Sequence, residues 1–548
     1  MNRRQHFGRS QFGLLSFLIA VGLTVSLAAC GGGGSGGSGS AAGSSGDTAG
    51  SGGGSGSGGS SSGGSGSSSG SGSGSQASSC TVSTTLVSCT PWIWEGGSDT
   101  LDSAGVYGTL GAAAANNVPG ARQQAVSWTD AAGNLWLFGG LGQDAGVADA
   151  AGVLNDLWRY SPTSNQWTWV SGSNAANPAG SYGQQGTPAA ANVPAPRYQA
   201  TGWSDPSGNF WVFGGLGKDD YTVLAPGDPL LNDLWQYDPA SNEWTWVSGS
   251  STFNSTGVYG TLGTPAATNV PPPRVGAASW TDASGNLWLF GGTGFDATVY
   301  QNIGQFNDLW VYRPTTKQWT WLGGQSPATD PQLNGFYAGM DYQGTYGTQG
   351  TAATANFPGS REFASTWIDA AGNFWLFGGD GYDKSRNYGL LNDLWEYNPT
   401  TNEWTWVSGS STSNAVGVYG TQGVPAGTNL PGARTAASTW IDTSGNVWLF
   451  GGGGLDGSGS KGALSDLWEY SPTTSQWTWV NGPKAAAAAG TYGTLGVAAT
   501  SNAPGSRLGS VAWTDSYGNH WLFGGYGFDD GDPSEIVHEQ YLNDLWRF

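Results

Sequence analysis

The chain has 548 residues, of which 95 are glycine and 30 are tryptophan, and only 10% are charged. Glycine at this level is typical of disorder, but so many tryptophans require a packed interior, which excludes a chain that is disordered throughout. The formal net charge of −20 disfavours nucleic acid and anionic membrane surfaces as partners, and leaves cations, neutral sugars and basic protein surfaces as candidate ligands.

Residues 1–29 have the features of a bacterial export signal. Three arginines precede the apolar stretch FGLLSFLIAVGLTVSLAA, which ends immediately before Cys30. The sequence LAAC at this point resembles the lipobox of bacterial lipoproteins, in which the cysteine becomes the lipidated first residue. The resemblance implies a protein anchored in the cell envelope by lipid at Cys30, in the outer membrane on its periplasmic or surface side. An ordinary signal peptide or a membrane anchor with an incidental cysteine is the alternative.

Residues 30–79 are almost wholly glycine and serine after Cys30, which is typical of a flexible tether. Such a chain has a mean reach of roughly 40 Å. The short segment 80–90 follows, and it contains Cys80 and Cys89. Outside the cytoplasm this pair predicts a disulfide. A catalytic thiol is the alternative, but no histidine is close in the sequence.

Residues 91–548 contain a sixfold repeat. The motif LWLFGG, or a close variant, occurs six times, and NDLW or SDLW also occurs six times. The first five copies of the second motif are followed by a W-x-W pair, whereas the chain ends at the sixth, NDLWRF. An unattached W-x-W pair, Trp92 and Trp94, stands before the first repeat. We therefore expect this pair to supply the last strand of the sixth repeat.

Each repeat alternates strand-like segments with turns rich in Asp, Gly, Asn, Pro and Ser. This pattern predicts four antiparallel strands per repeat, and six such sheets arranged radially form a β-propeller. A strand ending in Gly-Gly, followed by a second aromatic strand, a polar turn and a tryptophan, resembles the kelch repeat. The resemblance implies an all-β, six-bladed kelch-type β-propeller over 91–548, closed by an N-terminal strand that completes the last blade.

The period is mostly 73–77 residues, longer than the roughly 50 residues of a kelch repeat. The excess is an 18-residue segment before each repeat, such as GVYGTLGAAAANNVPGAR, whose length and Tyr, Asn, Pro and Arg positions are constant. We expect this segment to be ordered, with its tyrosine packed as an anchor; stacking of the tyrosine on a sugar is the alternative.

Two spacings vary among the repeats. These are the stretch from Gly-Gly to NDLW and the stretch after the third W-x-W pair, which is longer than its equivalents. In a propeller the corresponding loops emerge on one face. Variable loops on a constant scaffold favour a binding face there, although unselected loops also drift in length.

Six arginines begin the first strand of the repeats and are candidates for the binding face, because kelch domains that bind acidic peptides use arginines at similar places. The alternative is a set of structural pairs with the aspartate of each NDLW motif. The arginines are Arg122, Arg197, Arg274, Arg361, Arg434 and Arg507.

Six aspartates follow the Gly-Gly pairs on the same face and complete the candidate binding face. The surrounding G-G-x-G-x-D pattern looks like a calcium-binding nonapeptide, but the copies are too far apart to share ions, so we expect no metal centre and at most weak Ca²⁺ binding. They are Asp144, Asp219, Asp296, Asp383, Asp456 and Asp529.

Catalytic candidates are few. The repeats hold two histidines, His520 and His538, and no cysteine, which excludes the Tyr–Cys pair of the galactose-oxidase type of copper enzyme. We therefore expect an envelope protein that binds a protein or glycan through the variable face, as a monomer, with no catalytic residue, no cofactor and no nucleic-acid partner. The alternatives are a carbohydrate-active enzyme of the epimerase or mutarotase kind, and a purely structural surface component.

Overall fold

The computed structural model describes residues 81–82, 87–88, 91–146, 151–217, 229–295, 303–326, 342–531 and 540–548. The described residues form strands and turns, and none of them belongs to a helix that could cross a membrane. The predicted export signal, the lipidation at Cys30, the tether and the Cys80–Cys89 disulfide fall outside these ranges. A two-residue hairpin, β1 (Thr81–Val82) with β2 (Val87–Ser88), lies between the two cysteines in the sequence.

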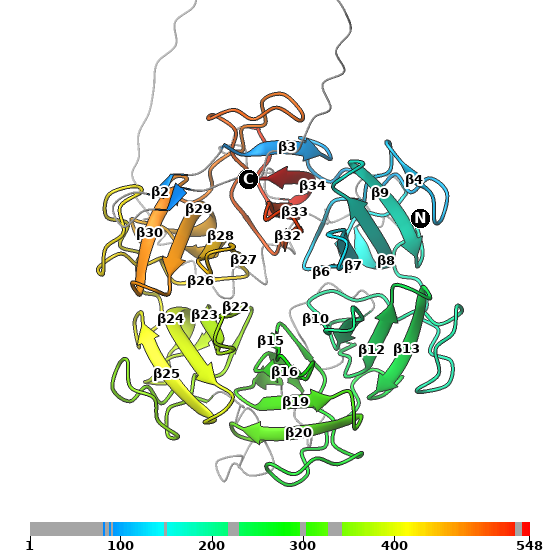
Figure 1. Ribbon diagram of the computed structural model, residues 1–548, viewed down its shortest axis with the longest axis horizontal. Coiled ribbons are helices and arrows are strands. Elements are labelled where there is room, and N and C mark those ends of the chain that lie inside the picture. Colours follow the sequence, from blue (N-terminus) through cyan, green and yellow to red (C-terminus); the bar gives the residue numbers. More distant parts are fainter. Residues whose placement is uncertain are drawn as a thin grey trace, which may run out of the picture. The chain divides into compact units, whose positions relative to one another are not determined.

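The remaining described residues form seven antiparallel sheets. Six of them lie around a central axis, one for each repeat (Figure 1), and we call these blades one to six in chain order. The seventh is a three-stranded sheet within the third repeat. The innermost strands are β6 (Val126–Thr129), β10 (Thr201–Ser204), β15 (Ala278–Thr281), β22 (Ser365–Ile368), β27 (Ser438–Ile441) and β32 (Val511–Thr514). The second strands are β7 (Leu135–Gly142), β11 (Phe210–Phe213), β16 (Leu287–Phe290), β23 (Phe374–Tyr382), β28 (Val447–Leu455) and β33 (His520–Gly527).

The outer half of each blade repeats in the same way. The third strands are β8 (Gly152–Ser161), β12 (Leu234–Asp238), β19 (Leu309–Arg313), β24 (Tyr388–Asn398), β29 (Lys461–Ser471) and β34 (Gln540–Arg547). The outermost strands are β9 (Gln166–Ser171), β13 (Glu243–Ser248), β20 (Gln318–Gly323), β25 (Glu403–Ser408), β30 (Gln476–Asn481) and, in blade six, β3 (Ile93–Gly96).

Short strands extend the blades at their Gly-Gly ends. Five of these hold the arginines: β5 (Arg122–Gln123), β14 (Arg274–Val275), β21 (Arg361–Glu362), β26 (Arg434–Thr435) and β31 (Arg507–Leu508). In blade three β14 pairs with β17 (Thr293–Phe295), which pairs with β18 (Ile303–Gln305).

The turn between the first two strands is built by an aspartate. In blade one the Oδ1 atom of Asp130 accepts hydrogen bonds from the backbone N–H groups of Ala132 and Asn134, each at 2.9 Å, and Trp136 Nε1 donates to Oδ2 at 2.9 Å. The same D-x-x-G-N pattern occurs once in each of the six repeats. It is therefore a structural turn that also fixes a core tryptophan.

The core lies between the blades. Because both faces of every inner strand are covered by neighbouring blades, their aromatic residues are buried on both sides. Phe210 of blade two, for example, stacks on Trp128 of blade one with ring centroids 5.1 Å apart. Blade six also packs on blade one, where the rings of Trp521 and Tyr160 meet edge-on with their centroids 5.3 Å apart.

The N-terminal strand β3 pairs with β34, the last strand of the chain, as the sequence predicts. Trp94 lies opposite Trp546, and Trp92 is 3% exposed with its ring 4.5 Å from that of Phe548. Arg547 forms an ion pair with Glu95 at 2.6 Å. The two ends of the described propeller thus occupy one blade.

The 18-residue segments are ordered, as predicted, and each covers the outer edge of its own blade. In blade one β4 (Ala113–Ala114) pairs with the outermost strand β9, and Asn117 Nδ2 donates to Trp167 O at 3.1 Å. In blade six the equivalent Asn502 Nδ2 donates to Trp92 O at 3.1 Å, so the segment contacts a residue from the N-terminal part of the chain. These contacts cover strand edges that would otherwise be free to pair with another chain.

Candidate functional site

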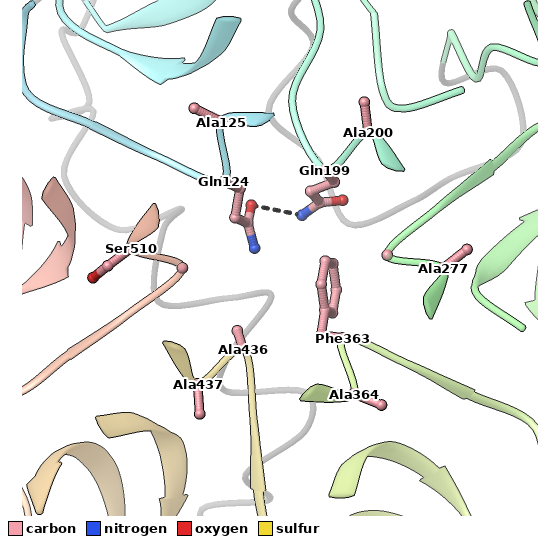
Figure 2. A pocket seen from close by; sticks show the side chains of 12 residues that line it. Gln124, Ala125, Gln199, Ala200, Ala277, Phe363, Ala364, Ala436, Ala437 and Ser510 are labelled. Carbon is pink, nitrogen blue, oxygen red and sulfur yellow. Dashed lines mark hydrogen bonds between the residues drawn. The ribbon is translucent and has the colours of Figure 1, made fainter. Parts of the chain in front are cut away.

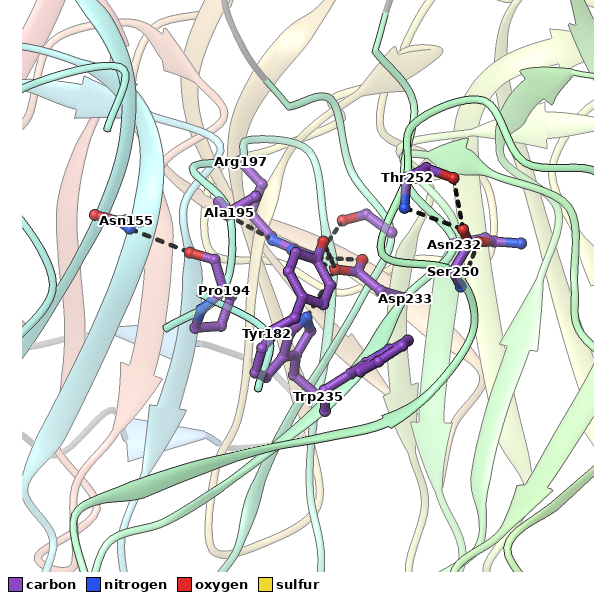
Figure 3. Close-up of polar contacts among 12 residues, drawn as sticks. Asn155, Tyr182, Pro194, Ala195, Arg197, Asn232, Asp233, Trp235, Ser250 and Thr252 are labelled. Atoms are coloured by element: carbon purple, nitrogen blue, oxygen red, sulfur yellow. Dashed lines mark hydrogen bonds and ion pairs between the residues drawn. The ribbon is translucent and has the colours of Figure 1, made fainter. Parts of the chain in front are cut away.

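Each NDLW aspartate is the centre of a buried polar cluster, drawn for blade two in Figure 3. Arg197 makes a two-point contact with Asp233, Nη1 to Oδ1 at 2.8 Å and Nη2 to Oδ2 at 2.7 Å. Tyr182 and Trp235 both donate to Oδ2 of the same carboxylate, at 2.6 and 2.7 Å. The tyrosine of the 18-residue segment therefore anchors that segment by a hydrogen bond as well as by packing.

The six candidate arginines all take part in such clusters, and each is about 1% exposed. Burial alone would lower the pKa of Arg122, but the charge of Asp156, its hydrogen bonds and the contribution of Tyr107 together raise that pKa above its ordinary value. The geometry is that of structural Arg–Asp pairs. A ligand on the surface of the propeller does not reach these guanidinium groups. The pairs are Arg122–Asp156, Arg197–Asp233, Arg274–Asp308, Arg361–Asp393, Arg434–Asp466 and Arg507–Asp544.

The candidate aspartates after Gly-Gly form loop turns where the structure describes them. Asp383 Oδ1 accepts from the N–H groups of Ser385 and Asn387 at 2.7 and 2.9 Å, and Oδ2 accepts from Ser413 N at 3.1 Å. Asp144, Asp456 and Asp529 make similar backbone contacts. Asp219 and Asp296 lie outside the described residues. Among the described residues, no group of three or more His, Cys, Asp or Glu side chains is arranged to hold a metal ion.

A ring of backbone hydrogen bonds surrounds the central channel. Each blade contributes the residue two positions after its arginine, and each N–H donates to the equivalent C=O of an adjacent blade. The bonds are Gln124 N to Gly509 O (2.7 Å), Gly509 N to Ala436 O (3.0 Å), Ala436 N to Phe363 O (3.0 Å), Phe363 N to Gly276 O (2.8 Å), Gly276 N to Gln199 O (3.0 Å) and Gln199 N to Gln124 O (3.0 Å).

All six ring residues have a left-handed backbone. Four of them are not glycine: Gln124, Gln199, Phe363 and Ala436 have φ values of 54°, 58°, 52° and 52°. A left-handed non-glycine residue costs of order 1–3 kcal/mol and persists where its surroundings enforce it. The hydrogen-bond ring supplies that enforcement here, and it places the side chains of these residues around the channel.

The ring encloses a cavity of about 190 Å³ whose wall differs from blade to blade (Figure 2). On one side Gln124 Oε1 accepts a hydrogen bond from Gln199 Nε2 at 2.9 Å. The aromatic ring of Phe363 projects from the opposite side, over Gly276, where a methyl group would lie 2.9 Å from the phenyl ring. The propeller is nearly symmetric, but this pocket has two amides, one aromatic face and otherwise small residues.

A second asymmetric feature adjoins Phe363. Glu362 lies opposite Asp380 in the ladder between β21 and β23, so the two carboxyl groups share one face of the sheet. Burial, with the nearby charge of Asp380, raises the pKa of Glu362 to about 8. Burial likewise raises the pKa of Asp380 to about 6, although Tyr388 donates to its Oδ2 at 2.8 Å. Nothing in the repeat pattern singled out this pair, because it occurs in one blade alone.

His520 is buried at 5% exposure in β33, next to Phe548, in place of the Leu, Phe or Val of the other blades. Desolvation lowers its pKa to about 4, so the imidazole is neutral at neutral pH. Its place in the core matches the interpretation of His520 as a variant core residue. His538 falls outside the described residues.

Comparison with known proteins gives one relative with the same kind of scaffold. Over 257 residues the chain is 27% identical to an N-acetylneuraminate epimerase of Yersinia enterocolitica, an enzyme of a kelch-type propeller family. The match covers 44% of this chain and 56% of the relative, so it spans about half the length of each protein. No protein-family model matches the chain.

Proposed function

We propose that this protein is a lipid-anchored protein of the bacterial cell envelope that binds a glycan in the channel pocket of its propeller. The export signal, Cys30 and the Gly/Ser tether support the anchoring in the outer membrane. The tether gives the propeller room to reach a ligand away from the lipid surface. In this proposal the protein acts as a monomer without a cofactor.

The asymmetric wall of the pocket carries the proposal. A glycan presents hydroxyl groups, which both donate and accept hydrogen bonds, and apolar C–H faces. Gln124 and Gln199 offer amides that both donate and accept, and Phe363 offers an aromatic face across the cavity. Concave sites with a few fixed polar groups beside an apolar wall are typical of small-molecule binding. At about 190 Å³ the pocket suits one sugar unit rather than the surface of a folded protein.

Strain at the ring supports the same site. The three side chains of the proposed contact all come from left-handed residues, and four such non-glycine residues in one ring are energetically unfavourable. Glycines at the remaining positions, Gly276 and Gly509, leave room for the side chains of Phe363 and Gln124. Backbone strain of this kind concentrates where side chains must be held in a fixed orientation for a ligand.

A carbohydrate epimerase or mutarotase on the same propeller is the second candidate. The relative named N-acetylneuraminate epimerase favours it. Acid–base catalysis needs a titratable group within hydrogen-bond reach of the substrate. The cavity's described lining contains none, and the carboxyl of Glu362 faces Thr293 and Gln305. The described geometry therefore favours binding over turnover.

A glycan array screened with the chain from residue 31 onward tests the proposal. The strongest glycan should bind at least about tenfold more weakly to Phe363→Ala, because the aromatic face is lost. Tyr517→Ala is the matched control, since Tyr517 is an aromatic residue 55% exposed on a turn of blade six. Absence of any glycan ligand, or equal loss in both variants, would overturn the proposal. Proton NMR of the glycan incubated with the protein distinguishes binding from catalysis. An epimerase or mutarotase would change the ratio of epimers or anomers over time, whereas a binding protein would not.

A further inference from the structure

The boundary between blades three and four differs from the boundary between blades two and three in one cluster of side chains. Between blades two and three, Leu216, Leu230 and Val275 form an apolar cluster. The residues at the same repeat positions one blade further on are Thr293, Gln305 and Glu362. Three contacting apolar positions have thus been replaced together by residues that carry oxygen.

A fourth oxygen-bearing residue joins them. Asp380 lies opposite Glu362 in the β21–β23 ladder. Gln305 Nε2 donates a hydrogen bond to the backbone O of Asp380 at 3.1 Å. Thr293, Gln305 and Asp380 are the groups that act on the carboxyl of Glu362. The charge of Lys461 acts on the other carboxyl, that of Asp380. Two carboxyl groups therefore face each other, together with an amide and a hydroxyl group.

Two of these oxygens lack a partner although they are buried. Asp380 and Gln305 are each 5% exposed, and Asp380 Oδ1 and Gln305 Oε1 make no hydrogen bond. A buried polar oxygen without a partner costs free energy, and a buried carboxylate costs more. An apolar cluster serves the same position in the neighbouring boundary, so packing alone does not require the polar set.

We propose that Glu362, Asp380, Gln305 and Thr293 form a site for a divalent cation, Ca²⁺ by the chemistry of its ligands, that joins blades three and four. Carboxylate and side-chain amide oxygens are the ligands that Ca²⁺ prefers, in flexible arrangements completed by water. Two carboxylates balance the charge of one divalent ion. The site is distinct from the G-G-x-G-x-D loops, because it uses Asp380 and not Asp383.

The test is Ca²⁺ titration of the full chain after treatment with a chelator, followed by calorimetry. We expect one saturable site, and at least about tenfold weaker binding in Glu362→Gln and in Asp380→Asn. Glu469→Gln is the matched control, because Glu469 is another buried carboxyl group, 1% exposed in blade five, and its loss should leave Ca²⁺ affinity unchanged. Asp456→Asn should also leave it unchanged, since Asp456 is in a G-G-x-G-x-D loop.

A triple variant guards against misfolding of the single variants. Thr293→Leu, Gln305→Leu and Glu362→Val together install the side chains of the neighbouring boundary, which the fold already accommodates. Added CaCl2 should raise the melting temperature of the wild-type protein above that in NaCl of equal ionic strength, and should not raise that of the triple variant. Lack of saturable binding of Ca²⁺, Mg²⁺ or Mn²⁺ at millimolar concentration, or unchanged Ca²⁺ binding by the triple variant, would overturn the proposal.

Discussion

Replacing Trp92 with alanine should destabilise the propeller by about 3–5 kcal/mol, the usual cost of removing a buried tryptophan. Trp92 is 3% exposed, and its ring lies 4.5 Å from that of Phe548 and 5.4 Å from that of Phe450. Two such aromatic pairs account for about 1–3 kcal/mol, and lost apolar burial with the remaining cavity accounts for the rest. A loss of this size means that the segment carrying β3, although far from the rest of blade six in the sequence, is held as firmly as an internal strand.

Urea unfolding followed by tryptophan fluorescence measures this effect. Trp167→Ala is the matched control, because Trp167 occupies the equivalent position in blade one and is 4% exposed. The two variants should lose similar free energy of unfolding, and deletion of residues 91–95 should lower the melting temperature at least as far as Trp92→Ala. A loss below about 0.5 kcal/mol for Trp92→Ala, beside a large loss for Trp167→Ala, would refute the closing role of β3.

Three further predictions follow from the described contacts. Asp233→Asn should cost about 3–5 kcal/mol by urea unfolding, because it leaves the Arg197 guanidinium buried without its counter-charge; a loss under about 1 kcal/mol would contradict the structural pair. His520→Leu should remove part of the pH dependence of the free energy of unfolding. The folded pKa of His520 is about 4, below its unfolded value near 6.5, so the wild-type protein should lose about 2 kcal/mol of stability as the pH falls from 7.5 to 5. Equal pH profiles of the wild type and this variant between pH 7.5 and 5 would exclude that role. Gly276→Ala should weaken glycan binding, because its methyl group would displace the Phe363 ring. Unchanged affinity in calorimetry would contradict the proposed position of that ring.

The repeat pattern was sufficient to predict the blades and the strand that completes the last one. The constant spacings reflect the hydrogen-bond register that all repeats share. The unattached Trp92–Trp94 pair indicates which strand completes blade six. The Arg–Asp pairs and the ordered 18-residue segments followed from the same constancy. The structure adds that the segment tyrosine shares the carboxylate of the pair, as Tyr182 does with Asp233.

The pocket and the proposed cation site could not be predicted in this way. The ring positions hold Gln, Gln, Gly, Phe, Ala and Gly, which share a left-handed backbone but no side-chain chemistry. Glu362 and Asp380 are separated by the same number of residues as the equivalent pairs in the other blades, such as Val275 and Thr293. Their contacts with Thr293 and Gln305 depend on how two blades pack. Features that break the symmetry of a repeat are invisible to an argument from what the repeats share.

A crystal structure of the propeller with the strongest glycan from the array tests the central claim most directly. We expect a sugar unit in the channel pocket, between the amides of Gln124 and Gln199 and the face of Phe363. A sugar bound elsewhere on the propeller, with the channel pocket empty, would contradict it.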